Sequence, residues 1–585
     1  MSRFRHGETI SPLSGNVIAG TPVHPFGPVQ ARLFRDLTRS LDPFIWKSGD
    51  TIPISKGRRR PARAEGTMSM VSPVSHPLDL RPWGAIILKF LPSKHLLAID
   101  QGTTGTTVLV VGSRGDVLGK ATREFPQIFP EPGWVEHRPD DIWSSVLVAA
   151  REALNSAGLR GGGIAAIGIA NQRETTLLWE RRTGKPLGNA IVWQDRRTAG
   201  LCGALKRRGL ESVVRARSGL RLDPYFSGTK IRWLLDQSKS LRRRAESGDI
   251  AFGTVDSALL RRLTGGAVHA TDPTNASRTL LMNLRGLRWD PMLCRALGVP
   301  AAMLPEIRPT IGIFGRTRGA SLIPDGVPIA AMAGDQQAAL FGQACFRPGE
   351  AKCTFGTGSF LLINTGSRPL PSRSGCLPTV AWSWKGGVRY ALEGSAFVCG
   401  AAVQWLRDGL GIIRRSSDVE SLARSVHDSA GVEFVPALTG MGAPRWKPLA
   451  RGLLCGLTRG AAKAHIARSV LEGLALQNVE LLRAMERDLG RRVAVIKVDG
   501  GASANDLFMS LQADYSGARC VRPRIVETTA LGAAFMAGLG VGAWKNLDEV
   551  RALWRKDREF RPNLSQKRRE RRLESWKRAA RRAEL

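Results

Sequence analysis

The sequence has no run of about 18 apolar residues, so no transmembrane helix is expected. The apolar stretch 83–90 is too short, and lies too far from the start, to be a secretory signal. The eight cysteines are widely spaced and none forms a C-x-x-C pair. This spacing argues against a zinc site or a disulfide framework. We therefore expect a cytoplasmic protein with reduced thiols.

Two common phosphate-binding motifs are also missing. Neither G-x-x-x-x-G-K-[ST] nor G-x-G-x-x-G occurs. P-loop and Rossmann interpretations therefore lack their usual signals.

Acidic residues are few, with 50 Asp and Glu against 86 Lys and Arg, giving a formal net charge of +36. The excess is spread along the chain, mostly as arginine, and is not confined to one stripe. Such a charge attracts anions and gives salt-sensitive binding to nucleic acid without sequence preference. We expect no specific nucleic-acid partner.

The length of 585 residues exceeds what one hydrophobic core supports, so two large domains are expected. Residues 1–92 differ from the rest, because they are rich in Pro, Ser and Arg and show no sustained period. We interpret them as a disordered extension or as sequence upstream of a misassigned start. A transit peptide is the alternative, and the acidic residues of this segment count against it.

Three apolar strands run into an aspartate beside a glycine, at Asp100, Asp335 and Asp499. A carboxylate at the end of a buried strand lies at the crevice where α/β proteins bind ligands. Glycine lets backbone N–H groups approach a phosphate, and carboxylates hold Mg²⁺ or accept a proton. Three such strand ends predict one nucleotide site between two domains.

A unit of strand, Gly-Thr turn and strand occurs twice. Residues 96–100 and 106–111 flank the first turn, and residues 359–364 follow the second turn, 356–358. We therefore predict duplicated halves that face one cleft. A further buried strand is predicted over 163–170. Periodicity predicts helices over 141–154, 466–489 and 528–539, and a basic, solvated helix after Pro562.

Several motifs in order resemble the FGGY carbohydrate kinases, and within them the members that phosphorylate glycerol. They are Asp-Gln-Gly-Thr-Thr (100–104), Pro-Gly-Trp-Val-Glu-His (132–137), Asn-Gln-Arg-Glu-Thr-Thr (171–176), Ala-Ile-Val-Trp-Gln (190–194), Asp-Pro-Tyr-Phe-Ser-Gly-Thr-Lys (223–230), Thr-Asn-Ala-Ser-Arg (274–278), Ala-Gly-Asp-Gln-Gln (333–337), Gly-Thr-Gly (356–358) and Asp-Gly-Gly-Ala (499–502).

The resemblance covers about residues 93–565. It implies an α/β fold of the actin, hexokinase and Hsp70 type, with two RNase-H-like domains flanking a nucleotide cleft. A glycerol-binding domain would span 93–342 and a nucleotide-binding domain 343–565, with a basic tail at 566–585. The implied activity is ATP-dependent conversion of glycerol to sn-glycerol 3-phosphate in glycerol catabolism, with Mg²⁺, in a homo-oligomer (dimer or tetramer).

The resemblance also implies the substrate residues. The polyol-binding positions of the family fall on Arg173, Glu174, Tyr225, Asp335, Gln336, Trp193 and Phe360. Arginine donates, glutamate accepts and tyrosine does both, which suits the hydroxyls of a small triol. The two aromatic positions pack on the glycerol carbons in the family. Taken singly, these aromatics suit an ordinary core, Arg173-Glu174 a surface ion pair and Tyr225 a turn.

The nucleotide positions of the family fall on Thr103, Thr104, Gly105, Thr357, Gly400, Gln404, Gly501 and Asn505. Asp100 matches the carboxylate near Mg²⁺, which acts through water. Asp335 matches the general base that takes the proton from the terminal hydroxyl of glycerol.

One position departs from the family pattern. Members usually carry Ser-Ser-Arg after the first Thr-Thr, where this chain has Gly105-Thr106-Thr107. That arginine reaches a nucleotide phosphate in the family, and a charge-assisted hydrogen bond contributes about 1.5–3 kcal/mol. Nucleotide affinity or rate is therefore expected to be lower by about 10–150-fold.

Three rival functions stay open on the sequence. The first is an FGGY kinase that acts on a pentose or hexose derivative. The second, motivated by the missing arginine, is a degenerate kinase that binds ligand without turnover. The third is a basic, nucleic-acid-associated protein.

Overall fold

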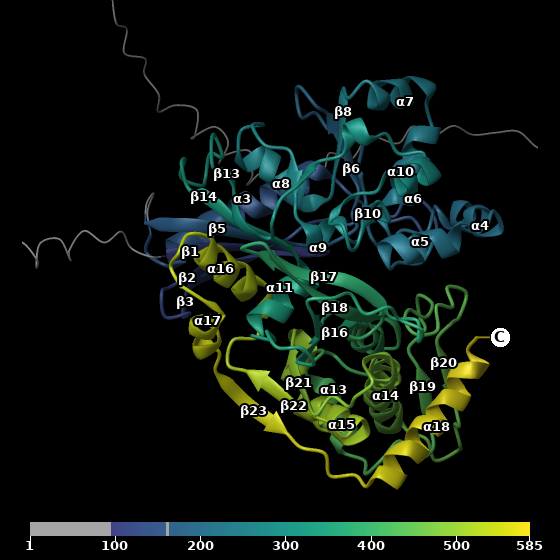
Figure 1. Cartoon of the computed structure of the whole chain (residues 1–585). Coiled ribbons are helices and arrows are strands. Elements are labelled where there is room, and N and C mark those ends of the chain that lie inside the picture. Colours follow the sequence, from purple (N-terminus) through teal and green to yellow (C-terminus); the bar gives the residue numbers. More distant parts are fainter. Residues whose placement is uncertain (1–94, 160–162, 585) are drawn as a thin grey trace, which may run out of the picture. The chain divides into compact units, whose positions relative to one another are not determined.

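The computed structural model describes residues 95–159 and 163–584. The extension predicted for residues 1–92 lies outside the described residues. Two mixed β-sheets, each covered by helices, organise the described part of the chain (Figure 1).

The first sheet has six strands in the order β13-β14-β5-β1-β2-β3. Their bounds are β1 His95–Gln101, β2 Gly105–Val111, β3 Val117–Glu124, β5 Ile164–Asn171, β13 Ile311–Arg316 and β14 Pro328–Gly334. Successive side chains of a strand point to opposite faces. On β1, Leu97 and Ile99 therefore join one core with α3 (Pro139–Ser156) and α8 (Val255–Leu263). Leu96 and Ala98 join another core with α16 (Thr528–Gly540).

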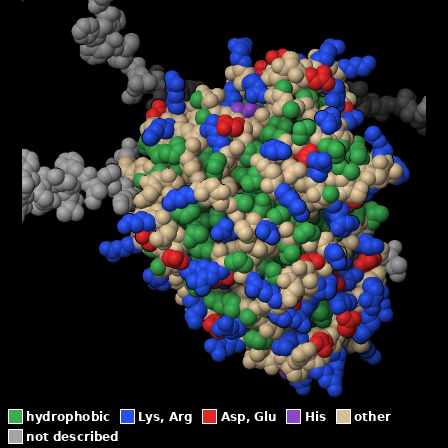
Figure 2. All heavy atoms as spheres, viewed as in Figure 1, with side chains coloured by type: hydrophobic (Ala, Val, Ile, Leu, Met, Phe, Trp, Pro, Cys, Tyr) green, Lys and Arg blue, Asp and Glu red, His purple; other side chains and the backbone are tan. Residues whose placement is uncertain are grey.

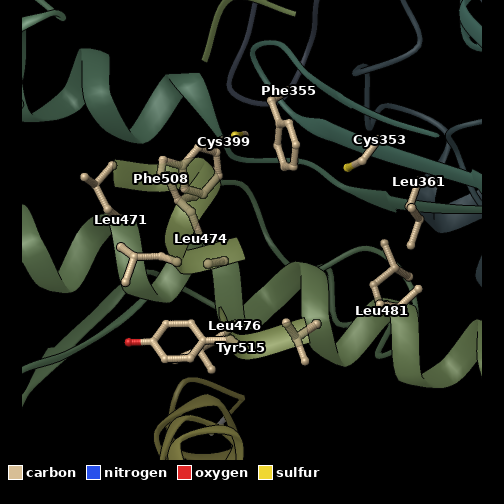
Figure 3. Close-up of a cluster of buried hydrophobic side chains, with 14 of the residues drawn as sticks. Cys353, Phe355, Leu361, Cys399, Leu471, Leu474, Leu476, Leu481, Phe508 and Tyr515 are labelled. Atoms are coloured by element: carbon tan, nitrogen blue, oxygen red, sulfur yellow. The ribbon is translucent and has the colours of Figure 1, made fainter. Parts of the chain in front are cut away.

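The second sheet has seven strands in the order β17-β18-β16-β15-β21-β22-β23. Their bounds are β15 Ala351–Phe355, β16 Ser359–Gly366, β17 Leu377–Trp384, β18 Gly387–Ala396, β21 Val495–Asp499, β22 Arg519–Pro523 and β23 Lys556–Phe560. The long helix α14 (Lys463–Leu489) and α15 (Asp506–Ser516) share a large apolar core with this sheet. Figure 3 shows part of that core, with Phe355, Leu474 and Phe508 pointing toward one another.

The two sheets repeat one topology. In the first, β1 pairs antiparallel with β2 and parallel with β5, and β5 pairs parallel with β14. In the second, β15 pairs antiparallel with β16 and parallel with β21, and β21 pairs parallel with β22. Each sheet also ends in an antiparallel strand beyond these. The predicted duplication and the two-domain α/β fold class are confirmed.

Helices α11 (Asp335–Gly342) and α16 lie against each other between the two sheets. They approach so closely that a Cβ on Gly532 of α16 would be 1.9 Å from the Ala338 carbonyl oxygen. Only a glycine fits there. Although α16 lies within the predicted 343–565 domain, it covers the first sheet. The chain thus crosses back to the first half before it ends.

The predicted regular elements at 96–100, 106–111, 141–154, 163–170, 359–364, 466–489 and 528–539 all occur within two or three residues of the expected bounds. The expectation for the C-terminal helix needs correction. Helix α18 (Gln566–Arg582) is solvated on one face only, because Leu573, Trp576 and Ala580 are buried in the core of the second half. Trp576 Nε1 also donates to the Phe434 carbonyl at 3.0 Å.

The remaining elements lie outside the two main sheets. Their bounds are β4 Glu136–His137, β6 Leu177–Glu180, β7 Ala190–Ile191, α4 Ala199–Arg207, α5 Leu210–Ser218, α6 Ser227–Asp236, α7 Lys239–Glu246, β8 Ile250–Gly253, β9 Ala270–Thr271, α9 Pro273–Ala276, β10 Met282–Asn283, β11 Arg288–Trp289, α10 Pro291–Leu297, β12 Glu306–Ile307, α12 Gly400–Gln404, α13 Asp418–Arg424, β19 Glu433–Val435, β20 Leu453–Cys455 and α17 Leu547–Leu553.

Basic side chains are scattered over the face of the molecule seen in Figure 2, rather than gathered in one stripe. Among the residues that the structure describes, no helix is both long enough and apolar enough to span a membrane.

Candidate active site

The end of β5 supplies the first two polar residues of the site. Arg173 and Glu174 follow β5 after Gln172, and both are almost fully buried. Glu174 has a φ of 60°, a left-handed conformation that is uncommon outside glycine. Strained backbone of this kind clusters at functional sites, where the surrounding structure holds it in place.

The guanidinium group of Arg173 is surrounded by acceptors. Its Nε lies 3.0 Å from Asp335 Oδ1, and its Nη2 donates to Glu393 Oε1 at 3.2 Å. Its Nη1 also donates to the other oxygen of Glu393. Two longer contacts, to Gln337 Oε1 at 3.4 Å and Tyr225 Oη at 3.5 Å, complete the shell. These two weak contacts are the ones that a ligand hydroxyl can replace most easily.

Glu393 is a buried acid that the sequence analysis did not single out. It lies on β18 of the second sheet and contacts both Arg173 and Arg278. Its Oε1 accepts from Arg173 Nη2 at 3.2 Å and from Arg278 Nη2 at 2.9 Å. Burial alone would raise the pKa of Glu393, but the two guanidinium groups lower it to about 2. Glu393 is therefore a permanent anion that joins the two halves of the protein.

Glu174 completes this buried network. Its Oε1 accepts from Arg278 Nε at 2.6 Å. Burial raises the pKa of Glu174, whereas Arg173 and Arg278 pull it down. Two carboxylates and two guanidinium groups thus form one buried network, which fixes the orientation of each member.

Tyr225 lies between the buried charges and the aromatic side chains. Burial raises the pKa of its hydroxyl well above the ordinary range, so the group stays a neutral phenol. Its ring contacts Trp193, with centroids 5.7 Å apart. The buried ammonium of Lys230 holds the backbone here, donating to the carbonyls of Pro224 and Tyr225 at 2.7 Å.

Asp335 begins α11, directly after β14. Its Oδ1 accepts from the backbone N–H of Gln336 at 2.7 Å, and its side chain is 25% exposed. It is thus the accessible member of the polar cluster. Gln336 turns away from it and accepts a hydrogen bond from the buried Lys352.

Trp193 and Phe360 stand beside this cluster with their ring centroids 6.1 Å apart. Both are only partly buried, and Phe360 also lies 6.0 Å from the guanidinium carbon of Arg173. Trp193 Nε1 donates to Thr103 Oγ1 at 2.8 Å. Trp193 is therefore tied directly to the first Gly-Thr turn.

The first Gly-Thr turn connects β1 to β2, and Asp100 stands at its base. Burial raises the pKa of Asp100 to about 8, and the charge of Asp335 adds to the shift. Thr104 is exposed at the tip of the turn, and Gly105 opens β2. Asp335, which follows β14, thus acts electrostatically on Asp100 of β1, although β5 lies between these two strands.

The second Gly-Thr turn opens on a cavity of about 510 Å³ in the second half. Its lining includes five of the eight predicted nucleotide residues, Thr357, Gly400, Gln404, Gly501 and Asn505. Phe355, Leu471, Leu474 and Phe508, also seen in Figure 3, form an apolar wall. The cavity therefore combines polar turns with an apolar surface, as ligand sites commonly do.

Local backbone geometry explains two of the residues around this cavity. Gly500 has a φ of +84°, and a Cβ there would lie 2.7 Å from the Phe355 carbonyl oxygen, so only glycine fits. Asn505 caps α15, because its Oδ1 accepts from Phe508 N at 2.8 Å. Asn505 thus caps a helix in addition to its predicted role as a nucleotide contact.

A second cavity, of about 990 Å³, joins the two groups of residues. Trp193 and Arg196 of the first half line it together with Thr357 and Phe397 of the second. Thr357 lines both cavities. The two cavities therefore adjoin at Thr357, and the second one reaches Trp193 beside the polar cluster.

The described residues contain no group of three or more His, Cys, Asp or Glu side chains placed to hold a metal ion. Asp100 lies beside the first turn, and the charge of Asp335 acts on it. One or two carboxylates plus substrate phosphates are the usual ligands of Mg²⁺. The residues present therefore fit a Mg²⁺ ion that arrives with a phosphate ligand.

Several residues of the site escaped the sequence analysis. Glu393, Lys352 and the acceptor role of Gln337 were missed, and Arg278 was noted only within a motif. A signal for Glu393 did exist, because it is the one charged residue in the small and apolar run 390–396. A lone acid in a buried strand needs a partner, but the sequence does not say which.

Comparison with known proteins adds an independent finding. Residues 95–342 and 351–541 match the N-terminal and C-terminal domain models of the FGGY family of carbohydrate kinases. The chain is 56% identical over 488 residues to a glycerol kinase of Bdellovibrio bacteriovorus, covering 83% of this chain and 99% of that protein. It is 55% identical to a glycerol kinase of Thermus brockianus, over 84% of this chain and 98% of that protein.

Solved structures agree. The crystal structure of Plasmodium falciparum glycerol kinase with ADP is similar with a TM-score of 0.77 and 34% identity, covering 84% of this chain and 99% of that one. A xylulose kinase from Lactobacillus acidophilus has a TM-score of 0.73 at 22% identity, over 83% of this chain and 96% of that one, which shows a shared fold only.

Proposed function

Because this chain belongs to the FGGY family of carbohydrate kinases, we propose that it is an enzyme that transfers the terminal phosphoryl group of ATP to glycerol, giving sn-glycerol 3-phosphate and ADP. The observation that carries this proposal is the gathering of Glu174, Tyr225 and Asp335 around the guanidinium group of Arg173. The identity of over half to proteins named glycerol kinases supports the same substrate.

Asp335 is the proposed general base. It is the accessible carboxylate of the cluster, and Arg173 and the Gln336 N–H hold it in place. In that position it can take the proton of the terminal hydroxyl as the oxygen attacks phosphorus. A positioned base of this kind contributes about 10²–10⁴ in rate.

Arg173, Glu174 and Tyr225 are proposed to orient the triol. The Nη atoms of Arg173 donate, the second oxygen of Glu174 accepts, and the Tyr225 phenol does either. Trp193 and Phe360 cover the carbon chain. Fixing the reacting hydroxyl in this way replaces a bimolecular encounter by an oriented one, which can lower the barrier by several kcal/mol.

The two Gly-Thr turns are proposed to hold the β- and γ-phosphates in line with the attacking oxygen. Thr103, Thr104 and Gly105 would act from the first half, and Thr357 from the second. Gly400, Gln404, Gly501 and Asn505 would contact the rest of the nucleotide. Mg²⁺, with Asp100 acting through water, would neutralise charge on the phosphates. Domain closure would exclude water, the competing acceptor.

Substitution of the proposed base tests this assignment. Asp335→Asn keeps the size of the side chain but cannot accept the proton, so we expect loss of glycerol phosphorylation of at least 100-fold. ATP binding, measured by calorimetry, should stay within twofold. Asp408→Asn, at an exposed position on the second half, is the control and should keep full activity. Near-normal turnover of Asp335→Asn would remove the residue from this role.

A substrate panel tests the choice of acceptor. Glycerol, pentoses, hexoses and their derivatives are compared by coupled measurement of ADP release. Glycerol should exceed every sugar in kcat/KM. Preference for a pentose or hexose would assign the chain to another branch of the family, and absence of turnover on every acceptor would identify a degenerate kinase.

A further inference from the structure

A cavity of about 370 Å³ lies between α5 of the first half and the segment 369–378 of the second half. None of the residues assigned above to substrate or nucleotide lines it. One wall consists of α5, the turn after it and Arg285 at the β10–β11 turn; the other consists of Pro371, Ser372 and Pro378 around the start of β17.

The lining of this cavity has charge of one sign. Arg215, Arg217, Arg221 and Arg285 line it, and no aspartate or glutamate does. All four arginines belong to the first half. Guanidinium groups that converge without acids repel one another, and a bound anion relieves that repulsion. Their planar forks match the oxygens of phosphate.

The partners of these arginines leave most of their donors free for a ligand. Arg217 is held by Asp290, with Nη1 and Oδ2 2.7 Å apart. Arg221 lies 3.8 Å from Glu211, beyond hydrogen-bond distance. Arg215 makes only a 3.3 Å contact to the Ser372 carbonyl. Arg285 has no carboxylate partner among the described residues.

Backbone geometry keeps the cavity open. Gly219 ends α5 with a φ of +76°, and a Cβ there would lie 2.9 Å from Leu284 and 3.3 Å from Pro378. The opposite wall is fixed by Asp488, which accepts from the backbone N–H groups of Arg373 and Ser374 at 3.1 Å. The two walls are thus formed by ordered backbone.

We propose that this cavity is a binding site for a small anion that carries two phosphate groups. Arg217 anchors the site through Asp290, while Arg215, Arg221 and Arg285 donate to the phosphates. Arg215, Arg221 and Arg285 have no carboxylate within hydrogen-bond distance among the described residues, and their positive charges exceed what one phosphate dianion neutralises. The volume accommodates a small phosphorylated molecule and excludes a polymer from the interior.

The position of the site links it to both halves of the active site. Arg221 precedes Tyr225 by four residues. On the other wall, Leu377 is the register partner of Glu393 in the β17–β18 pair. A ligand that bridges these walls binds the folded, assembled pair of halves and not the unfolded chain, so it stabilises the protein.

Binding of inorganic pyrophosphate, with inorganic phosphate as the single-phosphate probe, tests the proposal by calorimetry and thermal denaturation. The variant Arg215→Ala/Arg285→Ala removes two exposed lining cations. The control Arg207→Ala/Arg243→Ala removes two exposed cations of the same half outside the cavity. We expect the Kd for pyrophosphate to rise at least tenfold in the first and less than twofold in the control. The Kd for ATP should change less than twofold in both.

The other outcomes contradict the proposal in separate ways. Equal weakening in both double variants would mean general electrostatic attraction. Unchanged affinity in the cavity variant, or a parallel loss of ATP affinity, would place the anion in the nucleotide cleft. Equal affinity of phosphate and pyrophosphate in the parent protein would exclude the two-phosphate ligand. Since only binding is measured, these results do not depend on the kinase proposal.

Discussion

Thr107 occupies the position where the sequence resemblance implies an arginine in related kinases, and its surroundings show where such a side chain would point. It lies on β2, two residues before Leu109, so it shares the sheet face that packs against α16. Its hydroxyl pairs with Thr122 Oγ1 at 3.0 Å across the β2–β3 ladder. This pair is exposed, and the described residues give it no ionic partner that an arginine would displace.

Thr107→Arg is therefore expected to increase activity. A restored guanidinium contact to nucleotide phosphate should raise kcat/KM for ATP by about 10-fold or more. Thr122→Val, which breaks the same hydroxyl pair without adding a charge, is the control and should leave this parameter unchanged. An equal rate for Thr107→Arg and the parent would show that other groups already neutralise the phosphate.

His137 provides a pH-dependent contribution to stability. It is fully buried, its Nε2 has no hydrogen-bond partner among the described residues, and its Nδ1 lies 3.4 Å from Gln172 Nε2. Burial lowers its pKa from 6.5 to about 4. Between these values the unfolded chain binds a proton that the folded protein does not, so stability is lost as pH falls from 6.5 toward 4.

We expect His137→Gln to lose less stability on acidification than the parent. The difference in free energy of unfolding between pH 7.5 and pH 5.0 should be smaller by about 1–2 kcal/mol in the variant. Denaturant titration at both pH values measures it. Other titrating groups are common to both proteins and cancel, so identical pH dependence would show that His137 does not titrate differently on folding.

At the scale of elements, helices α11 and α16 pack with their backbones in close contact, and this contact can be tested. Gly342 of α11 and Gly532 of α16 face each other's backbone, and a Cβ on Gly342 would lie 2.0 Å from the Thr528 carbonyl oxygen. Rigid backbone cannot yield as a side chain can. These helices also connect the two sheets, so their separation affects both halves.

Gly532→Ala should therefore destabilise the protein by about 1–3 kcal/mol, the usual cost of overpacking. Gly203→Ala on α4 is a matched control, because its Cβ would meet only Arg207 Nη1 at 3.6 Å. That control should be neutral or slightly stabilising, since alanine is the better helix former. Calorimetric melting compares the two, and equal melting temperatures would contradict the close approach.

At the scale of the whole molecule, Glu393 connects the two sheets through charge. It belongs to the second sheet, whereas its partners Arg173 and Arg278 belong to the first half. Removing one partner of a buried ionic network leaves an uncompensated charge. The consequence should appear both in stability and in the orientation of the substrate residues.

Glu393→Gln is expected to raise KM for glycerol at least tenfold and to lower stability by about 3 kcal/mol or more. The control Glu486→Gln disrupts a buried acid that pairs with Arg483 and Arg492 within the second half. It should lower stability without changing KM for glycerol. If both variants changed KM equally, Glu393 would be a structural residue only.

The resemblance of its motifs to a kinase family pointed to Arg173, Glu174, Tyr225 and Asp335. The amino-acid sequence by itself also determined the two Gly-Thr turns and the strands and helices predicted around them. These features depend on local periodicity and on residue types at strand ends, and both are readable along the chain. The repeated topology followed from them, because each half carries the same order of strand and turn.

Only the tertiary structure decided which surfaces meet. It placed α16 on the first sheet, buried one face of the basic helix α18, and brought Glu393 to Arg173 and Arg278. It also gathered four arginines around a cavity that no motif marks. A periodic pattern tells which face of an element is apolar or charged, but the partner of that face is chosen by packing between residues hundreds of positions apart, where the sequence carries no local signal.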